Sequence, residues 1–388
     1  MAQQSTNNPA SQTFLGRING GTNAANNRDL FLKLFSGEMF KGFQHETIAR
    51  DLVMKRTLKN GKSLQFIYTG RTKAEYHTPG NSILGNDQKA PPVAEKTITC
   101  DDLLISSAFV YELDETLAHY ELRGEISKKI GYALAQKYDR MIFRSITRGA
   151  RQASPVSMTN YVEPGGTQIQ VGGGSDADDA YSSTHLVNAF YDAAAALDEK
   201  GVSTQGRVGV LNPRQYYALI QAVGTNGLVN RDVQGSALQS GNGIIEIAGI
   251  KIYKSMNIPF FSKYGTKFAP SSGASASTDL ATVDPGNTGS FVSESIEAGT
   301  AATGANYGAR NNYGGTTAFA NSCGLIFQKE AAGIVEAIGP QVQVTSGDVS
   351  VVYQGDVILG RLAMGSDYLN PAASVELFAG TSTKPSAF

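Results

Sequence analysis

The feature that most restricts the fold is one long stretch of helical periodicity, which covers residues 113–149. Apolar residues recur in it at spacings of three and four, and they include Leu117, Ile126, Ile130, Leu134, Ile142 and Ile146. Acidic residues open the stretch and arginines close it, as the helix dipole favours. At about 1.5 Å per residue, such a helix is roughly 50 Å long. The pattern therefore predicts an extended molecule built along a rigid helical spine.

The segment before this helix has the composition of strands. β-Branched and aromatic residues dominate "SLQFIYTG" and "EKTITCDDLLISSAFVYEL", and turn residues fill the sequence between them. These patterns predict an antiparallel ribbon that runs from Leu64 to about Pro79 and returns from about Val93. Because a two-stranded ribbon is only marginally stable alone in water, we expect it to lie on another protein surface.

The tripeptide Gly61-Lys62-Ser63 at the start of this ribbon suggests a nucleotide site, because it ends many phosphate-binding loops. Such a loop also needs a glycine five residues before the Gly-Lys pair, where this chain has Arg56, and a helix after it. The residues after Ser63 have strand character instead. Asn60 and Gly61 predict a type I′ hairpin turn between extended segments. A nucleotide-binding enzyme is therefore disfavoured.

The N-terminal region divides into a polar arm and an aromatic helix. Residues 1–28 are rich in Asn, Gln, Ser, Thr and Gly, which is typical of a mobile arm. The residues that follow predict an amphipathic helix with Asn27 as its N-cap, and its apolar stripe includes Phe31, Phe35, Phe40 and Phe43. This stripe fits the core of its own chain and a neighbouring subunit equally well.

The rest of the chain mixes helices and strands, which predicts the α+β class. A helix is expected from a Thr184 cap to Gly201, after a loop at about 151–182. A strand, a turn and a helix then follow, with Asn212 as N-cap and Pro213 at the first helical position. "IIEIAGIKIYKSMNIP" predicts strands, residues 262–322 predict long loops, and strand and helix alternate in the last segment.

The balance of charge and the cysteine count restrict the partners and the compartment. The 33 Lys and Arg residues nearly match the 34 Asp and Glu residues, so contact with nucleic acid should be local or weak. Only 17% of residues are charged and 43 are glycine, which favours an obligate oligomer over a monomer. Two cysteines, no signal peptide and no long apolar run predict a soluble protein that folds in a reducing cytoplasm without contact with a membrane.

The sequence shows no convincing catalytic or metal-binding motif. The four histidines have no metal-binding spacing, and Cys100 has no local signature of a nucleophile. The acidic run from Gly172 to Asp179 lacks the glutamate of a calcium loop, so a solvated loop is expected there. We therefore expect no catalytic residue, no metal, no cofactor and no enzymatic activity.

Several stretches together resemble one protein family. They are "LFLKLFSGEMFKGF", "GKSLQFIYTGRTKAEYHTPG", "KTITCDDLLISSAFVYELDETLAHYELR", "VLNPRQYYALI", "GIKIYKSMNIP" and "VILGRLAMGSDYLNPAASVEL". In order and in composition they resemble the major capsid proteins of short-tailed phages of the autographivirus type (podoviruses), which have the HK97-type fold. The first three stretches are the specific ones.

The resemblance implies an α+β chain in four parts. It implies an N-terminal arm at 1–52, an extended loop (E-loop) at 53–108, a peripheral domain at 109–183 and 321–388 that includes the spine helix 113–149, and an axial domain at 184–320 with a loop insertion at 262–320. The E-loop and the arm would contact neighbouring subunits. The candidate E-loop contacts are Lys62, Arg71, Lys73, Glu75 and Tyr76. The alternative, that these charges only solvate the ribbon, stays open.

The resemblance also implies function and partners. Hexamers and pentamers would form an icosahedral head around double-stranded DNA, which they contact weakly. A scaffolding protein and a portal protein would assist assembly of the procapsid in the host bacterial cytoplasm, before DNA packaging completes the virion. An encapsulin-like compartment shell is the nearest alternative, and a nucleotide-binding enzyme or a secreted fibre protein are the alternatives from other classes.

Overall fold

The computed structural model describes residues 48–71, 76–81, 93–100, 103–112, 122–155, 157–158, 161–174, 176–220, 245–258, 321–344 and 353–385. Helices and sheets are mixed along the chain, so the predicted α+β class is confirmed. These residues fall into two compact units. Asp101–Gln136 and Ile338–Met364 belong to a first unit, and Glu46–Cys100, Lys137–Ala337 and Gly365–Phe388 belong to a second.

The first unit combines helix α4 (Leu122–Ala150) with strands β4 (Leu103–Tyr111) and β13 (Gly355–Tyr368), of which α4 and β13 continue into the second unit. β4 and β13 pair antiparallel in a four-stranded sheet of order β1-β12-β13-β4. Apolar side chains of the helix and the sheet form the core of this unit: Val110, Ile130, Leu134 and Ile358. Gly360 permits the close approach, because a Cβ atom there would lie 2.4 Å from Cγ2 of Ile130.

The predicted spine helix is confirmed from Leu122 to Ala150. Residues 113–121 of the prediction lie outside the described residues. The observed end at Ala150 differs by one residue from the predicted end. A long run of apolar residues at helical spacing is a strong local signal, and it explains this agreement.

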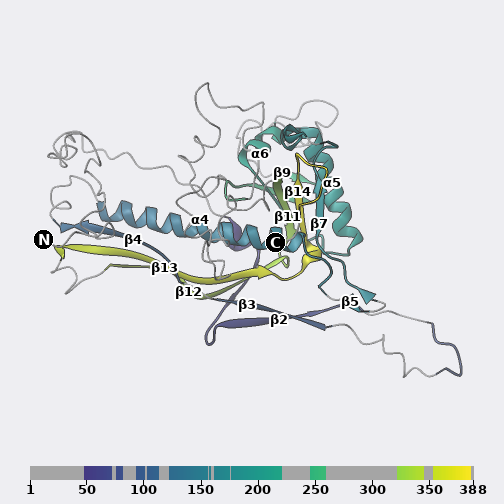
Figure 1. Cartoon of the computed structure of the whole chain (residues 1–388), viewed down its shortest axis with the longest axis horizontal. Coiled ribbons are helices and arrows are strands. Elements are labelled where there is room, and N and C mark those ends of the chain that lie inside the picture. The colour runs from purple at the N-terminus through teal and green to yellow at the C-terminus, as the bar shows by residue number, and fades with distance from the viewer. Residues whose placement is uncertain are drawn as a thin grey trace. The chain divides into compact units, whose positions relative to one another are not determined.

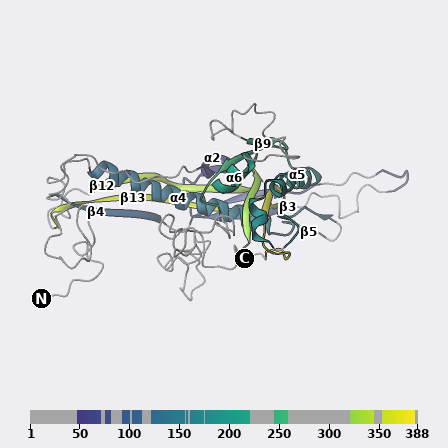
Figure 2. The same ribbon diagram turned by 90° about the horizontal axis from the view of Figure 1, so that it is seen from above.

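The second unit contains a six-stranded sheet with the order β7-β14-β11-β8-β10-β9. Its strands are β7 (Thr167–Gln170), β8 (Arg207–Leu211), β9 (Ile245–Ile247), β10 (Ile250–Lys254), β11 (Ser322–Gln328) and β14 (Ser374–Phe378). Helices α5 (Ser183–Glu199) and α6 (Pro213–Ile220) lie beside this sheet (Figure 1, Figure 2). Buried side chains of the two helices and the sheet form one apolar core. At Gly209 a Cβ atom would lie 2.7 Å from the Phe190 ring, so the glycine makes room for the helix.

Helix α5 ends as the sequence predicts but begins two residues earlier. Ser182, not Thr184, is the N-cap, and no side chain caps the amides there. At the other end, Gly201 has a φ of 69° and donates to the Asp198 carbonyl, while Val202 donates to the Leu197 carbonyl. This is the Schellman arrangement that a glycine after a helix favours.

The β8–α6 connection confirms the sequence prediction residue by residue. The Asn212 side chain accepts a hydrogen bond from the Arg214 amide at 3.2 Å, and Gln215 reaches back to the Asn212 amide at 3.1 Å. This reciprocal pair resembles a capping box, although Asn212 accepts from the second helical amide and not the third, and Pro213 occupies the first helical position.

The type I′ turn occurs at a different place from the one predicted. Ala248 and Gly249 have φ of 51° and 75° and join β9 to β10, which confirms strands in this segment. At the predicted position only Gly61 has a positive φ, of 91°. The flanking strands β1 (Met54–Thr57) and β2 (Ser63–Thr69) belong to different sheets. The Asn60-Gly61 turn is therefore a connection between sheets and not a hairpin.

Two other expectations are wrong within the described residues. Residues 321–344 and 355–378 form β11, β12 (Ala332–Val344), β13 and β14, with a 3₁₀ turn at Pro371–Ala373, and none of these residues lies in an α-helix. The predicted loop at 151–182 contains β5 (Ser157–Met158), β6 (Tyr161–Val162) and β7, which pairs parallel with β14. Residues 262–320 of the predicted long loop lie outside the described residues.

Candidate assembly surface

The predicted ribbon is present but shorter than predicted: β2 ends at Thr69, and the described residues 76–81, inside the predicted run to Pro79, form no strand. β2 and β3 (Val93–Thr99) pair antiparallel with Ser63 opposite Thr99 and Thr69 opposite Val93. Exposed and covered residues alternate strictly along β2, as a strand with one solvated face requires. The ribbon therefore has an inner face toward its own chain and an outer face toward solvent.

The inner face of the ribbon rests on its own chain through apolar contacts. Leu64, Phe66 and Ile98 pack in one cluster that also includes Leu58, Cys100, Val335 of β12 and Leu369. Ile98 is 1% exposed. The support that a two-stranded ribbon needs thus comes first from β12 and from the end of β13.

One lysine fixes the middle of β3 to the end of β13. The Lys96 ammonium lies 2.9 Å from a carboxylate oxygen of Asp367 and 3.8 Å from the centre of the Tyr368 ring. Arg148 of α4 approaches the same carboxylate at 3.7 Å. Because Lys96 and Asp367 are both mostly covered, this ion pair is screened less than a surface pair.

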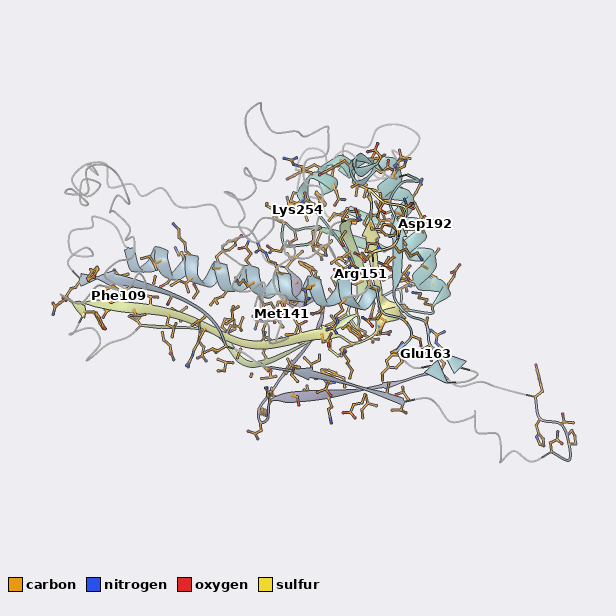
Figure 3. The ribbon with its side chains drawn as sticks, viewed as in Figure 1. Phe109, Met141, Arg151, Glu163, Asp192 and Lys254 are labelled. Carbon is orange, nitrogen blue, oxygen red and sulfur yellow. The ribbon has the colours of Figure 1, made fainter. Side chains whose placement is uncertain are left out.

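A buried glutamate contacts the far end of the ribbon stem, by which we mean the paired strands β2 and β3 together with Gly70 and Arg71. Glu163, which follows β6, is 2% exposed and lies close to the ends of β2 and β3 (Figure 3). Its carboxylate accepts a hydrogen bond from the Tyr68 hydroxyl at 3.4 Å and another from the Arg71 amide. It also lies 3.6 Å from Nε of Arg71. Arg71 is a predicted contact residue, and the structure gives it this partner within its own chain.

The outer face of the ribbon combines two exposed apolar side chains with polar ones. Ile67 is 75% exposed and Val93 is 61% exposed. Their neighbours on this face are polar: Ser63, Gln65, Thr69, Glu95, Thr97 and Thr99. Ile67 and Val93 thus form a small exposed apolar patch toward one end of this face, next to side chains that can form hydrogen bonds with a partner.

The structure describes only some of the residues that the sequence predicts as contacts. Lys62 is exposed at the base of the ribbon, where its carbonyl accepts from the Cys100 amide at 2.9 Å, and Tyr76 is fully exposed. Lys73 and Glu75 lie outside the described residues, as do Phe31, Phe35, Phe40 and Phe43. Sequence analysis missed Lys96 and Glu163, since their partners are remote in sequence.

Two buried carboxylates fix the chain that leads into the ribbon. The Glu336 carboxylate lies 3.2 Å from Nε of Arg50 and 2.6 Å from Nζ of Lys55. The Tyr138 hydroxyl donates a hydrogen bond to the same carboxylate at 2.6 Å. Burial alone would raise the pKa of Glu336, but hydrogen bonds from Lys55, Tyr138 and Arg50 outweigh it and lower this pKa.

The second carboxylate is Asp139 of α4. It accepts hydrogen bonds from the Ile48 amide at 3.0 Å, the Ala49 amide at 3.2 Å and the Asn257 side chain at 3.3 Å. Burial raises the pKa of Asp139 to about 6, although these hydrogen bonds oppose the shift. The two carboxylates together tie residues 48–55 to α4 and β12.

The described residues contain no group of three or more side chains suited to hold a metal. None of the helices described is both long and apolar enough to cross a membrane. In the acidic run, Asp179 pairs with His185 at 3.0 Å. A strand follows Ser63, so the tripeptide Gly61-Lys62-Ser63 does not lead into the helix of a phosphate-binding loop.

A comparison with protein families shows to which family this chain belongs. The model of the Gp10A-like major capsid proteins matches residues 65–303, which include most of the ribbon. The chain belongs to this capsid protein family. The predicted resemblance to capsid proteins of short-tailed phages is therefore confirmed.

Individual relatives of this capsid protein agree. It is 30% identical to the major capsid protein of Escherichia phage T7 over 199 residues, which are 51% of this chain and 57% of the relative. It is 29% identical to the major capsid protein of Enterobacteria phage T3 over 210 residues, which are 53% of this chain and 60% of the relative. The chain thus spans between half and two thirds of the length of these curated relatives.

Solved capsid structures extend the similarity to nearly the whole chain. A chain of the capsid of cyanophage P-SCSP1u is 30% identical and has a TM-score of 0.66, with 95% of this chain and 98% of that chain covered. A chain of the mature capsid of bacteriophage PhiM1 has a TM-score of 0.60 at 14% identity and 97% and 100% coverage, which supports the fold alone. The capsid protein therefore has the HK97-type α+β fold.

Proposed function

We infer that this capsid protein is the building block of an icosahedral phage head. Copies of it would associate as hexamers and pentamers into a closed shell that encloses double-stranded DNA, and its role would be structural and not enzymatic. The observation that carries this proposal is the similarity, over 95% of the chain, to a chain of the cyanophage P-SCSP1u capsid. The Ile67 and Val93 surface supports it, because it offers each subunit a ready contact.

The ribbon can stabilise a shell through its outer face. Ile67 is 75% exposed in the isolated chain, so burying it against a neighbour would contribute about 1–2 kcal/mol per copy. Polar and ionic contacts at the rim contribute less each, but a closed symmetric shell repeats every one of them. Lys62, Arg71, Lys73, Glu75 and Tyr76 remain proposed contacts of this kind, as do the four arm phenylalanines.

The domain scheme and the partners belong to the same proposal. The arm, E-loop, peripheral and axial divisions keep the bounds expected from the sequence. A scaffolding protein and a portal protein would direct assembly in the host cytoplasm, and the virion head would be the final location. With a net charge of −1, the shell would contact packaged DNA weakly, which suits release of the genome.

Electron microscopy of the chain expressed together with its phage's scaffolding protein tests the proposal. We expect uniform closed shells from the natural chain and from Ile67→Val, which keeps an apolar side chain on the outer face. Ile67→Asp places a charge there and should reduce shell yield at least tenfold, with an unchanged circular dichroism spectrum. Persistent monomers of the natural chain at every protein concentration and ionic strength would overturn the proposal.

A further inference from the structure

The contacts of Glu163 differ from those of the other buried carboxylates. Asp139, Glu336 and Glu376 each contact at least two separate elements of the fold. The hydrogen bonds and the ion pair described for Glu163 all come from Tyr68 and Arg71 of the ribbon stem. A carboxylate that is 2% exposed thus depends on one short segment more than ninety residues away in sequence.

Arg71 connects this glutamate to the end of helix α5. Its guanidinium donates to the Lys200 carbonyl, in the turn that Gly201 closes. The Lys200 ammonium in turn donates to the Gly165 carbonyl at 2.5 Å and to the Thr167 hydroxyl. The ribbon stem, the segment after β6 and the end of α5 are therefore joined pairwise in a closed three-way contact.

Besides the apolar packing of its inner face, the ribbon is held by polar contacts at two separate points. The first lies at mid-ribbon, where Lys96 contacts Asp367 and Tyr368. The second lies just beyond Thr69, where Arg71 and Tyr68 meet Glu163. The apolar cluster and the Lys96 contact hold the inner face of the ribbon, and the contact beyond Thr69 adds a hold at its far end that restrains its direction. Swinging away from the second point would leave the Glu163 carboxylate buried without its ribbon partners, which is strongly unfavourable.

We propose that Glu163 is a positioning residue that, with Arg71, fixes the direction in which the ribbon leaves the chain. The angle between neighbouring subunits would then follow from this contact, and with it the curvature and size of the shell. The inference rests on the proposed function, since it assigns the ribbon a neighbour to reach. Glu163 would act through the ribbon and would touch no other subunit itself.

The first test needs only the unassembled full-length chain. Amide hydrogen exchange is measured over residues 63–71 and 93–99, with the buried strand β8 as internal reference. We expect Glu163→Gln and Arg71→Ala to speed ribbon exchange at least tenfold and to leave β8 unchanged. Glu95→Gln, an exposed glutamate on the outer face of the same ribbon, should behave as the natural chain does. Unchanged ribbon exchange in both variants would overturn the proposal.

The second test measures shell diameters after co-expression with the scaffolding protein. We expect one narrow distribution for the natural chain and Glu95→Gln, and several sizes or open tubes for Glu163→Gln and Arg71→Ala. Arg71→Lys, which keeps the charge near Glu163, should narrow the distribution again. A loosened ribbon with an unchanged distribution would overturn the link to curvature. If the natural chain forms no shells, the proposed function fails, while the exchange result still decides whether Glu163 holds the ribbon.

Discussion

Replacing Arg151 with methionine should lower the free energy of unfolding of the second unit by about 3–5 kcal/mol. The side chains of Arg151 and Glu376 are both 0% exposed, and they form two hydrogen bonds of 2.7 Å and 2.6 Å that join the end of α4 to β14. The variant would leave the carboxylate buried, with the Ser322 hydroxyl and the Gln168 amide as its remaining side-chain donors in the structure. Those neutral donors do not offset the loss of a bidentate charged partner.

Urea unfolding of unassembled subunits, followed by circular dichroism, measures this effect. Lys329→Met, at an exposed position in the β11–β12 turn, is the control and should change the free energy of unfolding by less than about 0.5 kcal/mol. The double variant Arg151→Met with Glu376→Leu should recover at least half of the loss, because an apolar pair needs no charge compensation. A single-variant effect below about 1 kcal/mol, or no recovery in the double variant, would refute the reasoning.

Three further predictions follow from individual contacts. The pKa of Asp139 is raised from 3.8 to about 6, so the stabilisation that its protonation gives is fully present below pH 3.8 and is lost as pH rises through about 6. Between these pH values, the free energy of unfolding in urea should rise more steeply on acidification in the natural chain than in Asp139→Asn. Equal slopes of this free energy against pH in the two chains would contradict the prediction. Gly360→Ala should cost about 1–3 kcal/mol in thermal unfolding, because its Cβ atom would lie 2.4 Å from Ile130, whereas Gly339→Ala, with no atom within 4 Å, should be nearly neutral. Lys96→Met should make the ribbon several-fold more sensitive to limited proteolysis, and the same sensitivity as the natural chain would show that the Asp367 contact does not hold β3.

Local patterns in the sequence were sufficient for the elements that depend on local signals. The spine helix, the two strands of the ribbon and the Asn212 N-cap each follow from the residue types within the element itself. The prediction that strand and helix alternate in the last segment was wrong, because tertiary packing and not local periodicity decides the structure there. Residues 332–336 are continuously buried in a sheet, and such a run has no period that distinguishes a strand from a helix.

The contacts that fix the ribbon could not be found in the sequence alone. Arg71 and Glu163 are separated by 92 residues, and nothing near either of them indicates the other. β7 was missed because "TQIQ" is short and polar, and it becomes a strand through its pairing with β14. The residue types of the outer face were visible in the sequence, but its exposure depends on how the inner face packs.

The most direct test of the central claim is a cryo-electron microscopy map of particles assembled from this chain. The account predicts a closed icosahedral shell of hexamers and pentamers, in which Ile67 and Val93 of each ribbon are buried against the next subunit. The same map should show Arg71 still paired with Glu163 of its own chain. A shell in which the outer face of the ribbon points to solvent, or assembly into unclosed aggregates alone, would contradict it.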